Sequence, residues 1–344
     1  MGEDLPLHGL KFGITRLLRL LPLLLAGLAP GWARGQGTFT GSAEIIPAQV
    51  ERMYVKGMDF LVRTQTPDGS WPDEQMNAKP AITALAVVSL LAHGDDPNFG
   101  PYKTTVARGL DFILKQQNAT TGYIGPTMYN HGFSTLALAE SYGAVDDPRL
   151  GPALRRAVQL ILAAQQASNA KAWRYSPESN DADTTVSGAE MVALMATRNA
   201  GVPVPEKSIQ DGLHFYFSVQ TPDGGIGYVS ATAPNATRTA IGCLVMALAK
   251  DKNSPAFQSA FQFLKNARQD REQYPAYFRY YASQAYFQAS PELWDAWNHD
   301  NINTLRATQA ADGSWDGPVG LTFNTAGSLL SLALNYRYLP IYER

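Results

Sequence analysis

A ten-residue frame recurs six times along the chain and limits the folds that the chain can adopt. The frame begins with a basic, acidic or small residue, usually followed by Gly or Ala, continues with two adjacent apolar residues, and ends in Gln. Its first copy runs from Lys56 to Gln65. The final position of the frame falls at residues 65, 117, 165, 220, 268 and 309, with Arg in place of Gln at 268. Such spacing indicates a repeated structural unit.

Each repeat reads as two helices. Val55, Met58, Leu61 and Val62 form one apolar stripe at helical spacing, and the turn residues 66–69 then end this first helix. A second helix follows that is apolar on nearly all sides, which is typical of a helix buried on every face. The six second helices are expected to include residues 81–88, 133–139, 186–194, 239–246, 281–287 and 325–330.

Six such hairpins are expected to close into a ring. An open array would expose the apolar helices on its concave face as a large apolar patch. A ring with these helices inside and the amphipathic helices outside removes that exposure. The sequence therefore predicts an all-α fold, an α/α toroid of six hairpins with a cavity at the ends of the inner helices. We expect residues 34–344 to form this single domain.

The first 33 residues have the features of a secretory signal peptide. Lys11, Arg16 and Arg19 precede an apolar run at 20–29, and small residues favour cleavage after Ala33. A short N-terminal membrane anchor is the alternative. Because Cys243 is the only cysteine, no internal disulfide can form, which fits an exported bacterial protein. We expect a periplasmic or extracellular protein without a transmembrane span in the mature chain.

Composition excludes several classes of function. Apolar residues make up 45% of the 344 residues and charged residues 17%, enough for a large core. The net charge of −2 and the lack of a basic run argue against a nucleic-acid partner. The five histidines show no ligand spacing, so neither a metal site nor a cofactor is expected.

The repeat resembles that of squalene cyclases and protein prenyltransferase β chains, over essentially the whole mature chain. Residues 129–132, 173–175, 181–185 and 336–342 look like those of exported bacterial members of this repeat family, which largely lack an assigned function. The resemblance implies the α/α toroid. The Asp, Cys and His zinc ligands of the prenyltransferases are not apparent, since Cys243 lies within an apolar helix.

The resemblance also implies an acid. Class II terpene cyclases protonate an alkene or epoxide with an Asp-x-Asp-Asp motif, and residues 181–185 match the Asp-x-Asp-Thr-Thr variant. Asp183 would then be the acid, Asp181 its partner, and His131 a group at the same end of a neighbouring helix that orients Asp183. Two carboxylates close together in an apolar cavity cannot both ionise. The alternative is that Asp183 simply caps a helix and that His131 is a hydrogen-bonded structural residue.

Aromatic faces would stabilise the carbocation that follows protonation. The alternative for the dense aromatic run at 274–281 is a bulky core that fills the centre of the ring. The candidate cavity residues are Tyr129, Phe133, Trp173, Tyr228, Phe278, Tyr280, Tyr281 and Phe323.

Three functions are compatible with these features. The first is an exported cyclase-like protein that binds an apolar, isoprenoid-type ligand, with acid initiation at Asp183. The second is a non-catalytic module that binds a ligand or a protein at the cavity mouth. The third is an exported carbohydrate-active toroid, although the paired carboxylates of a glycosidase are not recognisable.

Overall fold

The described part of the chain is built from alternating outer and inner helices. The computed structural model describes residues 46–72, 77–267 and 272–342, and the expected signal peptide at 1–33 lies outside these ranges. The outer helices are α1 (Ala48–Thr64), α3 (Lys103–Gln116), α5 (Leu150–Ala167), α7 (Glu206–Ser218), α9 (Pro255–Asn266) and α11 (Pro291–Thr308). The inner helices are α2 (Lys79–Leu91), α4 (Met128–Ser141), α6 (Thr184–Asn199), α8 (Ala236–Leu248), α10 (Pro275–Ala289) and α12 (Leu321–Leu332).

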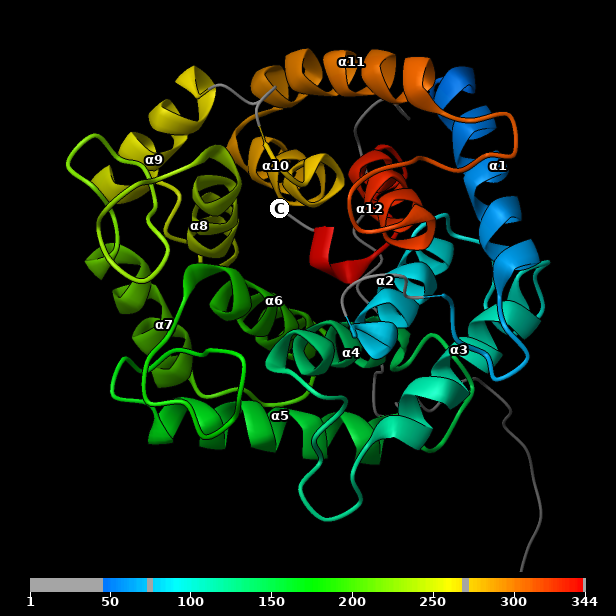
Figure 1. Cartoon of the computed structure of the whole chain (residues 1–344), viewed down its shortest axis with the longest axis horizontal. Helices are drawn as coiled ribbons and strands as arrows, with labels where there is room; N and C mark the ends of the chain where they lie inside the picture. The colour runs from blue at the N-terminus through cyan, green and yellow to red at the C-terminus, as the bar shows by residue number, and fades with distance from the viewer. Residues whose placement is uncertain (1–45, 73–76, 268–271, 343–344) are drawn as a thin grey trace, which may run out of the picture. The chain divides into compact units, whose positions relative to one another are not determined.

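The six inner helices surround the centre and the outer helices surround them (Figure 1). Each inner helix packs against the next, and α12 packs against α2, so the ring is closed. No strand forms in the described residues. The predicted all-α toroid of six hairpins is therefore confirmed.

Burial follows the expected division between the two layers. Almost every residue of α2, α4, α6 and α8 is buried, whereas α1 and α3 bury one face only. Inner helices are rich in Ala, Gly, Ser and Thr, which lets their axes approach closely. No helix in the described ranges combines the length and the apolar character that crossing a bilayer requires.

The Gln of the repeat joins one hairpin to the next. Gln65 Nε2 donates to Gly69 O in its own turn and to Thr105 O in the next outer helix, at 2.9 Å each. Gln117, Gln165, Gln220 and Gln309 repeat this pair of hydrogen bonds. The Gln of the repeat is therefore a structural link between neighbouring hairpins.

In four repeats a second set of bonds joins the turn to its inner helix. The donor is the backbone N–H of the apolar residue near the end of the turn, which is Trp in three of the four repeats. The acceptor is a hydroxyl oxygen early in the inner helix. The pairs are Trp71 with Thr83, Trp173 with Ser187, Ile226 with Thr239 and Trp315 with Thr325. The indole N–H of Trp71, Trp173 and Trp315 donates in turn to the preceding outer helix, which fixes the turn between the two layers.

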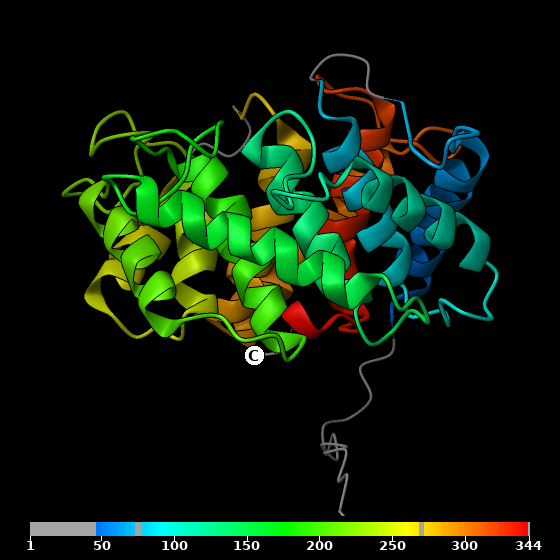
Figure 2. The ribbon, with the colours of Figure 1, turned by 90° about the horizontal axis from the view of Figure 1, so that it is seen from below.

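The chain ends at the face where the inner helices finish. The short helices η2 (Ala333–Asn335) and η3 (Pro340–Tyr342) follow α12, and η3 contacts α6. Asn199, the last residue of α6, donates to Pro340 O, and Ile341 and Tyr342 are buried. In the side view, η3 lies at this edge of the ring (Figure 2). The inner helices begin at the opposite face of the ring.

Candidate functional site

A cavity of about 450 Å³ lies where the inner helices begin. Its volume falls in the range of small-molecule sites, about 300–1,000 Å³. All six inner helices line it with residues of their first two turns: Ala81, Ile82, Leu85, Tyr129, Phe133, Thr185, Thr237, Arg238, Tyr277 and Phe323. The loops that precede these helices add Ala78, Thr127, Tyr175, Tyr228, Asn235, Glu272, Gln273, Tyr274 and Val319.

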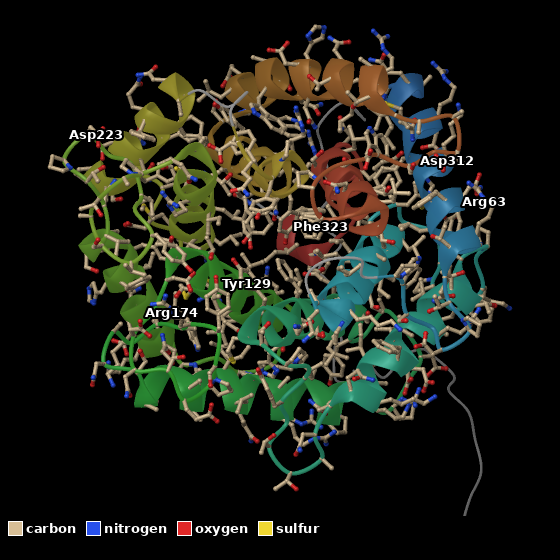
Figure 3. The ribbon with its side chains drawn as sticks, viewed as in Figure 1. Arg63, Tyr129, Arg174, Asp223, Asp312 and Phe323 are labelled. Atoms are coloured by element: carbon tan, nitrogen blue, oxygen red, sulfur yellow. The ribbon has the colours of Figure 1, made fainter. Side chains whose placement is uncertain are left out.

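The cavity has an apolar side and a polar side. Helices α2, α4 and α12 are neighbours in the ring and contribute Ile82, Leu85, Phe133 and Phe323. Helix α8 lies across the ring from α2 (Figure 1) and, with the loops before α8 and α10, supplies the polar side. Figure 3 shows Tyr129 and Phe323 near the middle of the ring and Arg174 farther out. An amphipathic cavity of this kind suits a ligand that is mostly apolar.

Asp183 caps helix α6 and is fully buried. Its Oδ1 accepts hydrogen bonds from the backbone N–H groups of Thr185 (2.9 Å) and Val186 (3.0 Å) and from the Thr185 hydroxyl (2.6 Å). Its Oδ2 is buried and has no hydrogen-bond partner among the described residues. The predicted helix cap is therefore confirmed, but it uses only one of the two oxygens.

The environment of Asp183 favours the protonated acid. Burial raises the pKa of this carboxyl above its usual value, and the three hydrogen bonds to Oδ1 offset only part of that shift. A protonated carboxyl with one free oxygen can donate a proton.

Asp183 lies just behind the cavity wall. Thr185, which donates to Asp183, lines the cavity, and so does Tyr129. Desolvation and, next, the Asp183 charge raise the pKa of Tyr129 well above its usual range, so the two groups are close. The Tyr129 hydroxyl lies 3.5 Å from that of Tyr277. Thr185 and Tyr129 thus stand between Asp183 and a ligand.

Asp181 and His131 occupy different surroundings. The Asp181 side chain is 65% exposed and pairs with Arg174 outside the cavity. His131 is fully buried: its Nδ1 accepts from the Ile124 N–H at 3.1 Å and its Nε2 donates to Ala157 O at 2.9 Å. Desolvation lowers the pKa of His131 to about 4, so the ring is neutral at pH 7. With both nitrogens engaged, His131 replaces the Thr or Ser that binds the turn in the other repeats.

The structure brings half of the expected aromatic residues to the cavity. Tyr129, Phe133, Tyr228 and Phe323 line it. Trp173, Phe278, Tyr280 and Tyr281 are buried elsewhere in the core. Trp173 is fixed by its bond to Ile161 O, and Tyr280 and Tyr281 pack edge to face against each other inside α10. The core-filling alternative is therefore correct for Tyr280 and Tyr281. The ring nevertheless contains a cavity, which these two residues do not line.

The candidate residues named from the sequence did not include Tyr175, Tyr274 or Tyr277, although the aromatic run at 274–281 was a possible cavity wall. Of the polar side of the cavity they included only Tyr228. The register of the repeat could have found several lining residues. In five repeats, the position two residues before the early Thr or Ser of the inner helix faces the cavity. These residues are Ala81, Phe133, Thr185, Thr237 and Phe323. Within the described ranges, no group of three His, Cys, Asp or Glu side chains gathers to hold a metal ion.

Solved structures share this architecture. A variant of the type II terpene cyclase MstE from Scytonema, in complex with geranylgeranyl dihydroxybenzoate as substrate, matches with a TM-score of 0.60 and 16% identity, covering 85% of this chain and 98% of that chain. An inactive variant of the α-1,6-mannanase GH76A from a Salegentibacter species, in complex with α-1,6-mannotriose, matches with a TM-score of 0.63 and 10% identity, covering 83% and 98%. At these identities the likeness shows the fold alone. No protein-family model matches the chain. No curated protein matches it either.

Proposed function

We propose that the toroid binds an apolar, isoprenoid-type ligand in the cavity at the start of the inner helices, and that Asp183 initiates its cyclisation as a general acid. One observation carries this proposal. A cavity with aliphatic and aromatic walls lies against a fully buried carboxyl whose Oδ2 has no hydrogen-bond partner among the described residues. The substrate complex of a terpene cyclase with the same fold supports it.

The proton transfer follows from this geometry. The proton would leave Asp183 past Thr185 and Tyr129 and add to one carbon of a double bond, which leaves a carbocation on the adjacent carbon. A second double bond of the same molecule attacks that cation and closes a ring, and loss of a proton ends the reaction as an isomerisation. The faces of Tyr129, Phe133 and Phe323 on the wall can stabilise the cation. The acid step also depends on Thr185 and Tyr129, because they separate Asp183 from the ligand.

The described lining of the cavity holds fewer carboxylates than a glycosidase uses. A glycosidase requires two carboxyl groups that flank the scissile bond. Among the described residues that line the cavity, Glu272 is the one carboxylate. Its two carboxylate oxygens accept hydrogen bonds from the Ala236 N–H and the Thr237 hydroxyl at the start of α8. Both oxygens therefore already bind the protein.

The first test is whether the purified protein carries an apolar ligand. Native mass spectrometry of the protein from its own host, followed by solvent extraction, is expected to reveal a bound isoprenoid or similar lipid. A protein that carries no such ligand and binds no added isoprenoid contradicts the proposal. A polypeptide partner in place of a lipid supports the non-catalytic module.

The second test separates catalysis from binding. Asp183→Asn keeps an oxygen for the helix cap but cannot donate a carboxyl proton. We expect it to reduce turnover of an added polyprenyl substrate by at least about 100-fold while the substrate still binds. Asp181→Asn is the matched control, because Asp181 lies outside the cavity, and it should retain turnover. Equal rates for both variants would leave Asp183 as a helix cap only.

A further inference from the structure

The polar side of the cavity contains a cation that has no anionic partner among the described residues. Arg238 is the one basic side chain among the described lining residues. Its Nε donates to Ile226 O at 3.4 Å and its Nη2 to Ala233 O, while its Nη1 binds no described residue. Arg174, which also lies near the Tyr228 ring, differs because it pairs with Asp181. The Arg238 charge therefore faces the cavity unpaired.

Glu272 does not neutralise Arg238. It is close enough for electrostatic attraction, yet the two side chains form no ion pair. The carboxylate instead accepts hydrogen bonds from the first residues of α8. Glu272 thus shows that this end of α8 accommodates a carboxylate, and its own charge is offset by the helix terminus.

Further donors surround Arg238. Asn235 uses its Oδ1 to cap α8, accepting from the Arg238 N–H at 2.9 Å, and this leaves its Nδ2 group on the cavity wall. The hydroxyls of Tyr175 and Tyr228 lie 2.9 Å apart on the same wall. Because the six inner helices begin at the cavity, their N-terminal dipoles add a positive potential. All these features favour a negative group on the ligand.

We propose that the ligand is an amphiphile with a single anionic head, of the carboxylate type, and that Arg238 binds this head while the chain lies against Ile82, Leu85, Phe133 and Phe323. One unpaired guanidinium on the wall matches one negative charge. The inference rests on the proposed function, since it specifies the class of apolar ligand that the same cavity takes. A guanidinium binds a carboxylate through paired, charge-assisted hydrogen bonds.

The test compares two ligands that differ only in the head. A 15-carbon isoprenoid carboxylate and the alcohol of the same chain are titrated into the protein at pH 7 by calorimetry. We expect the carboxylate to bind about 10- to 100-fold more tightly, the range of a hydrogen bond to a charged group. Arg238→Gln should remove this preference and leave the affinity for the alcohol unchanged. Arg238→Lys should restore part of the preference.

The matched control is Arg306→Gln, which removes one positive charge from the exposed face of outer helix α11 and should keep the full preference. The outcomes separate the two proposals. If the alcohol and the carboxylate bind equally well, the anionic head is wrong and the apolar ligand stands. If Arg238→Gln weakens both ligands equally, Arg238 only supports its loops and the head subsite is wrong. If neither ligand binds, the proposed function itself fails.

Discussion

Glu190 lies in the middle of α6, fully buried, and neither of its carboxylate oxygens has a hydrogen-bond partner among the described residues. Desolvation by burial raises the pKa of Glu190 well above its usual value, so folding favours the neutral form of the side chain. The unfolded chain ionises at the ordinary value, near about 4.3. Folding therefore requires Glu190 to keep a proton that the unfolded chain releases.

The pH dependence of stability follows with a definite sign. Above the unfolded pKa, the unfolded state binds fewer protons than the folded state, so stability falls as the pH rises. Relative to Glu190→Gln, the wild type should lose about 1.4 kcal/mol per pH unit between the two pKa values. Urea denaturation of both proteins from pH 4 to pH 8 measures this difference. Glu206→Gln on the surface is the control, and parallel pH profiles for wild type and Glu190→Gln would contradict the prediction.

His131 allows a prediction of the opposite sign. Its neutral ring joins the Ile124 N–H to Ala157 O, so His131→Ala should lower the free energy of unfolding at pH 7 by about 1–3 kcal/mol. The unfolded chain protonates His near pH 6.5 and the folded protein only near pH 4. Wild-type stability is therefore lost as the pH falls through this interval, and the effect of His131→Ala should shrink between pH 6.5 and pH 4. An effect that stays constant with pH would contradict the neutral structural role.

At the scale of elements, four turns of the repeat approach the next outer helix through a glycine, and the turn of the third repeat has Lys171 at the equivalent position. Gly313 has φ = +94°, and a Cβ at this position would lie 2.1 Å from Lys56 O in α1. Gly143 has nearly the same φ, +87°, but a Cβ there would have no neighbour within 4 Å. The two glycines thus share the backbone requirement and differ only in the close approach.

We expect Gly143→Ala to lower the free energy of unfolding by about 1–2 kcal/mol, the penalty of a left-handed alanine. Gly313→Ala should lower it by about 1–3 kcal/mol more, because the turn must move away from α1. Denaturant melts of both variants measure the difference. An equal decrease in the free energy of unfolding for both variants would mean that the turn at Gly313 accommodates the methyl group without strain.

The elements could be predicted from the sequence because their signals are local. The Gln and turn glycines mark the hairpins, and the apolar stripe separates outer from inner helices. The direction of each aromatic side chain could not be predicted in the same way. In α10, Tyr277 lines the cavity while Tyr281, one turn later, is buried. The sequence also could not show that Arg238 has no ion-pair partner among the described residues, since this depends on Glu272 binding the start of α8.

At the scale of the whole ring, the last repeat is hydrogen-bonded to the first. Gln309 Nε2 donates to Met53 O at 2.9 Å, and Arg63 donates to Asp312 O at 2.6 Å. Figure 3 shows Arg63 and Asp312 together at the outer edge of the ring. We call these two contacts the closing seam. The Gln309 bond repeats, between segments about 250 residues apart in sequence, the bond that joins consecutive hairpins.

The closing seam predicts how the protein opens. In an open array of repeats, unfolding starts at the ends and each repeat reports its own stability. In a closed ring, a weakened seam lowers the stability of the repeats on both sides of it. Gly313→Ala should therefore speed native-state hydrogen exchange in α1 and α2 as well as in α12, by similar factors. Gly143→Ala, away from the seam, controls for the general loss of stability. Acceleration confined to α11 and α12 would mean that the seam does not couple the two ends of the chain.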